Sequence, residues 1–202
     1  MQPMQPLRPP KWLDSLVLVS GLPRSGTSMM MRMLDAGGMP IYTDNIRTAN
    51  EDNPNGYYEL EKIKQIEQDA TWLRNEKGKA IKAISALLPA LPKDLYYHVI
   101  FMRRHMPEIL ASQQKMLKRR GVTDDRIPDA LMAAKYEAYL AATYKWIAKQ
   151  SHLNVLYVHY NEVIADPWNQ AERVNAFLEN RLNVAHMVRV VDPDLYRQRK
   201  QA

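Results

Sequence analysis

A short loop rich in glycine and serine joins an apolar run to a segment of helix formers near the start of the chain. This order exposes backbone N–H groups at the positive end of a helix dipole, where a phosphate binds well. Gly21, Gly26 and Ser28 have Walker A spacing, but Thr27 stands where that motif has its lysine, and the loop's cation is Arg24. A nucleoside triphosphatase needs that lysine on the β- and γ-phosphates. The loop therefore predicts a nucleotide phosphate site that does not split ATP.

The hexapeptide Pro23–Ser28 resembles the 5′-phosphosulfate loop of the sulfotransferases that use 3′-phosphoadenosine 5′-phosphosulfate (PAPS). That family has Pro-Lys/Arg-Ser-Gly-Thr-Thr/Ser after a strand, and the chain fits the pattern without a gap. The alternative is a solvated turn with a stray arginine. The resemblance implies catalysis by Arg24, as a cation at the bridging oxygen of the leaving phosphate, and cofactor binding by five residues: Arg24, Ser25, Gly26, Thr27 and Ser28.

A second cationic site follows the apolar run 97–102, which ends in Arg103 and Arg104. Ligands of open α/β sheets bind beyond the carboxyl ends of the strands, and an arginine fork there suits a phosphate. Arg104 and Ser112 resemble the family's 3′-phosphate motif, in which an arginine precedes a serine by the same interval. The family has its proline one position earlier than Pro107. Either the turn differs slightly or Arg103 shares the role; otherwise both arginines are surface charges.

The segment 155–162 also resembles the family, in which a strand ends in Tyr-Glu and a turn leads through Asp/Asn-Pro into a helix. The resemblance implies that Tyr160 contacts the adenine end of the cofactor, although Asn161 replaces the common glutamate. The alternative for Tyr160 is a tyrosine that packs its ring in the core and hydrogen-bonds its hydroxyl.

The segment around Lys82 resembles, more weakly, the family segment whose lysine helps hold the transferring group. The histidine that serves many members as general base has no counterpart. A carboxylate is the alternative base, and we expect Glu59 in this role because the preceding turn can hold it in the cleft. Asp44, Glu51 and His105 are the next candidates. The plainer interpretation of Glu59 is a helix N-terminal residue that serves the dipole.

The elements that must position these residues alternate between strands and helices. Apolar runs predict strands at 16–19, 79–84, 97–102 and 155–159, and periodic segments predict helices at 59–72, 107–118, 128–150 and 167–178. A further helix follows the first loop and stops near Gly37 and Gly38. This alternation predicts an α/β fold with a mostly parallel central sheet. The resemblance to the sulfotransferases implies that the fold is P-loop-like, with three layers and helices flanking the sheet.

Composition limits the possible functions. The 202 residues are 46% hydrophobic, with a net charge of +6, which suits an anionic ligand. Cysteine is absent, the five histidines lack metal-ligand spacing, and no apolar run is long enough to span a membrane. No basic–aromatic pattern indicates a nucleic-acid partner. We expect a flexible arm over 1–11, one domain over 12–202 and a cytoplasmic location.

The resemblance implies an enzyme that transfers a sulfuryl group from PAPS, without a metal, to a small-molecule or carbohydrate-like acceptor hydroxyl. PAP (adenosine 3′,5′-bisphosphate) is the product. One alternative is a P-loop kinase of a small metabolite, and another is a non-catalytic protein that binds PAP or a nucleotide. At the other end of the chain, Arg197, Arg199 and Lys200 resemble the family's last phosphate contact, although a solvated tail explains them equally simply.

Overall fold

The structure is a computed structural model that describes residues 12–44, 46, 47, 49, 56–119, 121 and 127–196. Its centre is a sheet of four parallel strands in the order β2–β1–β3–β4. The strands are β1 (Leu16–Gly21), β2 (Ala80–Lys82), β3 (Tyr97–Arg103) and β4 (Leu153–His159). The predicted α/β fold with a parallel sheet is confirmed.

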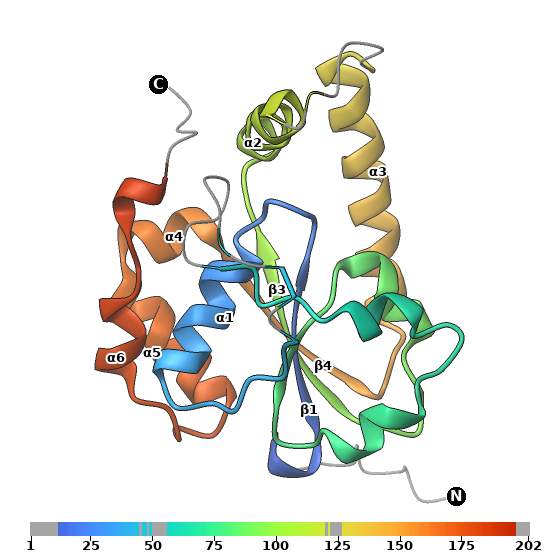
Figure 1. The fold of residues 1–202 in the computed structure, drawn as a ribbon, viewed down its shortest axis with the longest axis vertical. Coiled ribbons are helices and arrows are strands. Elements are labelled where there is room, and N and C mark those ends of the chain that lie inside the picture. Colours follow the sequence, from blue (N-terminus) through green and yellow to red (C-terminus); the bar gives the residue numbers. More distant parts are fainter. Residues whose placement is uncertain are drawn as a thin grey trace, which may run out of the picture.

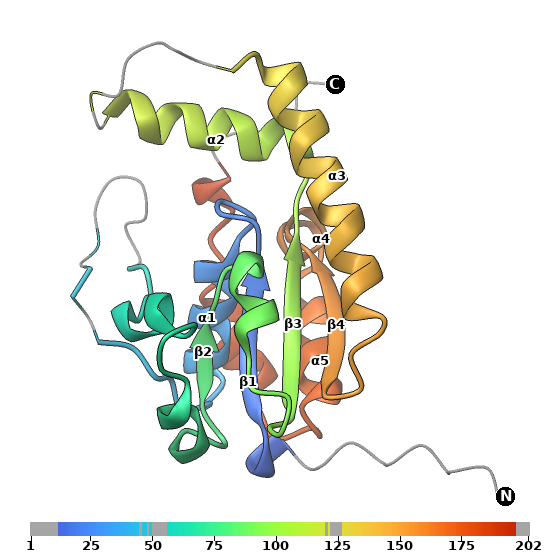
Figure 2. The same ribbon diagram turned by 90° about the vertical axis from the view of Figure 1, so that its right-hand side faces the viewer.

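Helices cover both faces of the sheet, so the fold has three layers (Figure 1). Helices α1, α4, α5 and α6 lie on one face, and α3 lies on the other with the 3₁₀ helices η2 to η4. Helix α2 crosses above the carboxyl ends of the strands (Figure 2). The α-helices are α1 (Thr27–Ala36), α2 (Met106–Arg119), α3 (Asp129–Ile147), α4 (Tyr160–Ala165), α5 (Pro167–Phe177) and α6 (Val184–Arg189). The 3₁₀ helices are η1 (Trp12–Asp14), η2 (Glu61–Gln65), η3 (Thr71–Asn75), η4 (Ser85–Ala90) and η5 (Pro193–Leu195).

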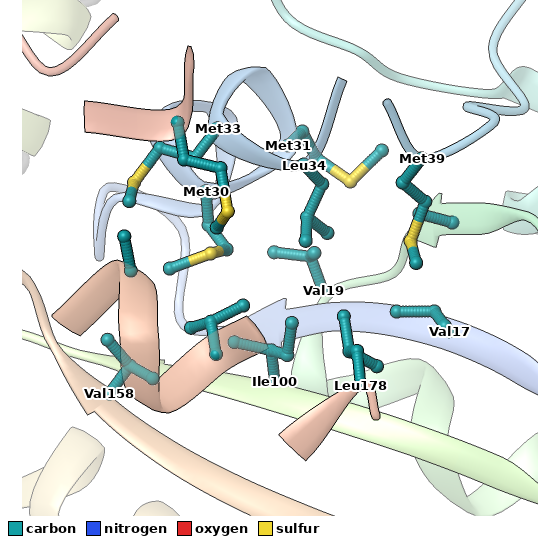
Figure 3. Close-up of a cluster of buried hydrophobic side chains, with 14 of the residues drawn as sticks. Val17, Val19, Met30, Met31, Met33, Leu34, Met39, Ile100, Val158 and Leu178 are labelled. Atoms are coloured by element: carbon teal, nitrogen blue, oxygen red, sulfur yellow. The ribbon is translucent and has the colours of Figure 1, made fainter. Parts of the chain in front are cut away.

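Strand β1 is buried along its whole length and contributes to two cores. Side chains alternate across a strand, so Val17 and Val19 face α1 while Leu16 and Leu18 face the 3₁₀ helices. The methionines of α1 fill the first core beside β1 (Figure 3). This double burial fixes the end of β1, and with it the loop that follows.

One predicted element is wrong. The segment 59–72 forms η2 and the start of η3 instead of one α-helix. The side-chain carboxylate of Asp69 accepts hydrogen bonds from the backbone N–H and the hydroxyl of Thr71, at 2.9 and 2.6 Å. The backbone carbonyl of Asp69 accepts a hydrogen bond from the indole N–H of Trp72. These local bonds compete with the helical ladder and end it. The short helices α4 and α6 also went unpredicted.

Some predictions lie outside the described residues: the arm 1–11, the base candidate Glu51, most of the turn at 52–56, and the basic residues Arg197, Arg199 and Lys200. Within the described part of the chain, no helix has both the length and the apolar character that crossing a bilayer requires.

Candidate active site

The loop from Gly21 to Ser28, here called the phosphate loop, links β1 to α1. Gly21 has a φ of 141°, and a Cβ there would lie 2.6 Å from the carbonyl oxygen of Met102. Gly26 has a φ of 101°, and a Cβ there would lie 2.5 Å from the ring of Tyr160. Both positions therefore need glycine, for conformation and for space. Arg24 has a φ of 71°, a strained conformation that often marks a functional loop.

The phosphate loop forms one wall of a cavity of about 530 Å³ at the carboxyl edge of the sheet. Ser25 does not line this cavity. Its side chain is buried, and its backbone N–H donates to the carbonyl of Leu22 at 3.2 Å. The other predicted site residues all line the cavity: Arg24, Gly26, Thr27, Ser28, Glu59, Lys82, Arg104, Ser112 and Tyr160.

Arg24 links Ser112 to Arg104 in the lining of the cavity. Nε of Arg24 donates to the Ser112 hydroxyl at 2.9 Å, and Nη1 of Arg104 donates to the carbonyl of Arg24 at 3.2 Å. The Arg104 guanidinium also stacks on the ring of Tyr160, 4.3 Å from its centroid. Three predicted segments thus converge on one group of cationic and polar side chains, although Arg24 bonds to Ser112 rather than pointing toward Lys82.

Arg104 has a buried counter-ion that the sequence analysis missed. Its Nε donates to Oε2 of Glu108 at 2.9 Å, and the two side chains are 8% and 2% exposed. Asn161 and Tyr196 donate to the same carboxylate. Burial alone would raise the pKa of Glu108, but the hydrogen bonds from Tyr196, Arg104 and Asn161 outweigh it, so the pKa is lowered. The sequence did contain a signal for this ion pair, because Glu108 lies four residues after Arg104, in the first turn of a predicted helix.

Lys82 lies elsewhere along the cavity, where β2 ends. Its Nζ lies 2.8 Å from the carbonyl oxygen of Tyr57, 3.2 Å from the Ser28 hydroxyl and 3.4 Å from Oε1 of Glu59. Burial lowers the pKa of Lys82, and the Glu59 carboxylate only partly offsets this effect. The ammonium therefore lies between the first turn of α1 and a carboxylate, in the lining of the cavity.

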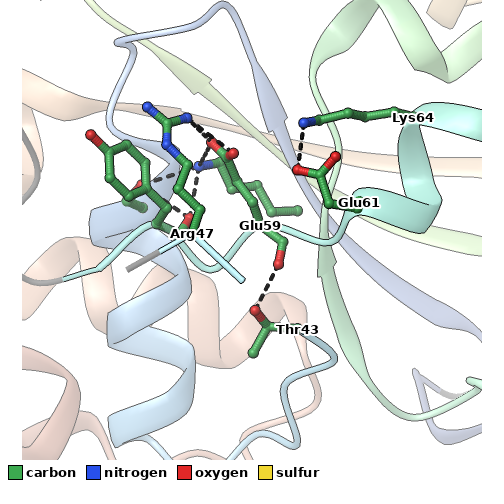
Figure 4. Close-up of polar contacts among 8 residues, drawn as sticks. Thr43, Arg47, Glu59, Glu61 and Lys64 are labelled. Carbon is green, nitrogen blue, oxygen red and sulfur yellow. Dashed lines mark hydrogen bonds and ion pairs between the residues drawn. The ribbon is translucent and has the colours of Figure 1, made fainter. Parts of the chain in front are cut away.

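Glu59 also bonds to Arg47, a residue that sequence reasoning missed (Figure 4). Nη1 of Arg47 lies 3.0 Å from both Glu59 carboxylate oxygens, and its guanidinium stacks 3.5 Å from the centre of the Tyr57 ring. Burial would raise the pKa of Glu59, but Lys82 and Arg47 together lower it below its ordinary value. Glu59 is therefore ionised at neutral pH and faces the cavity.

Comparison with known proteins bears on this arrangement. The model of the sulfotransferase family matches residues 47–183, which is more than half of the chain. The chain belongs to the sulfotransferase family. Comparison by sequence with curated proteins gives no match.

Solved structures of other sulfotransferases share the fold. Mouse sulfotransferase SULT7A1, complexed with PAP, superposes with a TM-score of 0.55 at 16% identity, over 88% of this chain and 63% of the mouse chain. This chain thus spans less than two thirds of the mouse protein. The sulfotransferase domain from the curacin biosynthetic pathway gives 0.51 at 15% identity, over 91% and 80%. The domain from the Synechococcus PCC 7002 olefin synthase gives 0.51 at 14%, over 95% and 90%. At identities as low as these, the superpositions show that the fold is shared and nothing more specific.

Several other candidates do not line the cavity. The carboxylate of Asp44 accepts from the backbone N–H groups of Ile46 and Glu61, which lower its pKa, so it caps a turn. The His105 side chain is 58% exposed and outside the cavity lining. Arg103 stacks between Tyr144 and Tyr157 in the other layer, so it does not share the role of Arg104.

The described residues offer no candidate metal site. Among the described residues, no three acidic, histidine or cysteine side chains group as a metal site would require.

Proposed function

We propose that this protein transfers a sulfuryl group from PAPS to an acceptor hydroxyl. The supporting observation is the joint placement of two anion-binding ends in one cavity. Arg24, Arg104 and Ser112 make one end, and Lys82 with Ser28 makes the other. A nucleotide with phosphate groups on both sides of its ribose matches two separate cationic ends, whereas a simple nucleoside monophosphate needs one.

The proposed chemistry is in-line displacement at sulfur. The acceptor oxygen forms a bond to sulfur, the bond from sulfur to the bridging oxygen breaks, and PAP leaves with the electron pair. Negative charge grows on that bridging oxygen, so a fixed cation nearby lowers the barrier. Lys82 is held at this end by Ser28, Tyr57 and Glu59. Arg24 joins it only by leaving Ser112, to which it is bonded.

Glu59 is the proposed base for the acceptor hydroxyl. It is an ionised carboxylate in the cavity, beside the proposed transfer cation Lys82. Its lowered pKa makes it a weaker base than an ordinary glutamate, but it stays unprotonated over a wider pH range. The proton passes from the acceptor to Glu59 and then to solvent.

Calorimetry with PAP and with ATP, each with and without EDTA, tests this proposal. We expect PAP to bind equally well in EDTA, because the phosphate loop lacks the Walker lysine and the described residues offer no grouped metal ligands. Binding of ATP that requires Mg²⁺ and exceeds binding of PAP would overturn the proposal in favour of a kinase. Tight PAP binding with no transfer to any acceptor would indicate a non-catalytic nucleotide-binding protein.

A further inference from the structure

The cavity lining contains cationic side chains that the proposed donor site and base do not use. Its described lining includes eight cationic side chains and two carboxylates, Glu59 and Asp192. PAPS carries about four negative charges, because a phosphate monoester contributes up to two and the phosphosulfate adds its own. The donor and Glu59 account for the cations described above. Four further cations of the lining take no part in the proposed transfer: Arg32, Lys64, Lys115 and Arg119.

These four cations come from three separate elements around the cavity mouth. Arg32 lies on α1, Lys64 on η2, and Lys115 with Arg119 on α2. Lys64, Lys115 and Arg119 are exposed, so they lie at the rim, where an entering ligand keeps part of its solvation. Lys64 bonds to Glu61 at 2.6 Å, and that glutamate does not line the cavity. Glu61 therefore offsets the charge of Lys64, whereas Lys115 has no ion pair with another described residue and gives the rim a positive field.

Apolar side chains also line the cavity, next in sequence to the proposed base and transfer cation and to a rim cation. Leu60 and Ile63 line the cavity from the segment that follows Glu59, and Ile84 and Leu87 line it just after Lys82. Met116 joins them from α2, next to Lys115. Ile84 is 41% exposed, which is high for an isoleucine beside a core. An exposed apolar surface inside a cavity indicates a ligand with an apolar body.

We propose that the acceptor is an organic anion: an apolar body with a hydroxyl at one end and a carboxylate, sulfate or phosphate group at the other. This inference rests on the proposed sulfuryl transfer. The rim cations bind the anionic group, the apolar lining holds the body, and the hydroxyl reaches Glu59 and Lys82. The reaction at sulfur is unchanged, and the anionic group of the acceptor takes no part in it.

The first test compares an acid with its neutral ester. PAPS-dependent sulfation is measured for 3-(4-hydroxyphenyl)propanoate and for its methyl ester. We expect kcat/KM to be about tenfold higher for the acid, because one opposite charge at a partly solvated rim has roughly this effect. Lys115→Glu should remove most of this preference. Lys118→Glu is the matched control, since Lys118 lies on the same helix, is exposed and does not line the cavity. It should preserve the preference.

The second test needs no turnover. Fluorescence measures the binding of 1-anilinonaphthalene-8-sulfonate, an apolar anion, and of its neutral analogue N-phenyl-1-naphthylamine to the PAP-loaded protein. We expect the sulfonate to bind more tightly, and Lys115→Glu to weaken it at least about fivefold more than Lys118→Glu does.

The results of these two tests distinguish failure of the anionic acceptor from failure of the proposed function. Equal effects of the two substitutions, or a preference for the neutral member of either pair, would overturn the anionic acceptor. Failure to sulfate the acid by a protein that binds PAP would also overturn it, while the proposed function would stand. Failure to bind PAP would instead overturn the proposed function itself.

Discussion

At the scale of single residues, Arg104 enters the proposed nucleotide site already paired with Glu108. Two of its nitrogens are in use, Nε on the Glu108 carboxylate and Nη1 on the carbonyl of Arg24. A guanidinium has five N–H donors, so this pairing leaves donors for a phosphate. Glu108 therefore orients Arg104 without exhausting its donors. The buried pair restricts the arginine to one geometry, as a binding site for a phosphate requires.

Arg104→Ala should weaken PAP about tenfold or more, and adenosine 5′-phosphosulfate, which lacks the 3′-phosphate, much less. A hydrogen bond to a charged group contributes about 1.5–3 kcal/mol. Calorimetry with both ligands measures this difference. Arg103→Ala is the control, because that side chain stacks between two tyrosines in the other layer. Equal losses for both ligands would mean that Arg104 does not bind the 3′-phosphate.

Glu59→Gln should lower kcat while leaving PAP affinity nearly unchanged, since the amide keeps the shape but loses the basic site. In the native enzyme, kcat should fall only below the ordinary pKa range of glutamate, because the ionised base is lost as pH falls through its lowered pKa. The alkaline limb should begin below the ordinary lysine pKa, because burial lowers the pKa of Lys82. A pH–rate profile measures both limbs. Full activity of Glu59→Gln would mean that another residue is the general base.

At the scale of elements, the phosphate loop depends on contacts made by distant parts of the chain. Tyr160, at the start of α4, packs against Gly26, and β3 approaches Gly21 through Met102. These contacts explain why the loop needs small residues at two positions. The sequence motif identified the glycines, but only the fold shows what they make room for.

Gly26→Ala should abolish detectable PAP binding, because the new methyl group would lie 2.5 Å from the Tyr160 ring. The control is Gly38→Ala. Gly38 has a similar φ, 93° against 101°, but no atom lies within 4 Å of its would-be Cβ. Both substitutions incur backbone strain, so thermal unfolding should show a loss of stability in each. PAP binding by Gly26→Ala at native affinity would contradict the steric argument.

The segment after α6 is connected to the proposed nucleotide site through Tyr196. Its hydroxyl donates to Glu108 and accepts a hydrogen bond from Asn161 at 2.8 Å. Tyr196→Phe should therefore weaken PAP several-fold, because Glu108 then holds Arg104 less firmly. Tyr139→Phe also removes a tyrosine hydroxyl, but one bonded to Ser85 outside the cavity lining, and should leave PAP affinity unchanged. Calorimetry on both variants decides whether Tyr196 positions the site or only stabilises the fold.

The predictable parts of the molecule were those that depend on local sequence. The strand–loop–helix at the phosphate loop, the parallel sheet and the approach of Arg104 and Ser112 to the same cavity follow from short motifs and burial patterns. Arg47 and Glu108 were missed because their importance arises only when distant segments meet. The prediction of one helix over 59–72 was wrong for a local reason, since the side chain of Asp69 forms hydrogen bonds with Thr71 that compete with those of a helix.

At the scale of the whole molecule, positive charge is concentrated where the ligands are expected. The chain has a net charge of +6, and cations from α1, α2, β2, η2 and the phosphate loop line a single cavity. Such clustering raises the local concentration of anions and speeds their association. Electrostatic attraction of this kind is weakened by salt, because the Debye length shrinks from about 10 Å at 0.1 M to about 3 Å at 1 M.

PAP affinity should therefore fall steeply as salt increases, while the affinity for adenosine, which has no phosphate, stays nearly constant. Titrations of both ligands over a range of NaCl concentrations measure the two slopes. Lys82→Met should reduce the slope for PAP, because it removes one cavity cation; Lys118→Met, outside the lining, should leave it unchanged. The same slope for PAP and adenosine would mean that salt acts on the protein as a whole rather than on the cavity. Because both variants lose one positive charge, net charge alone cannot produce a difference between them.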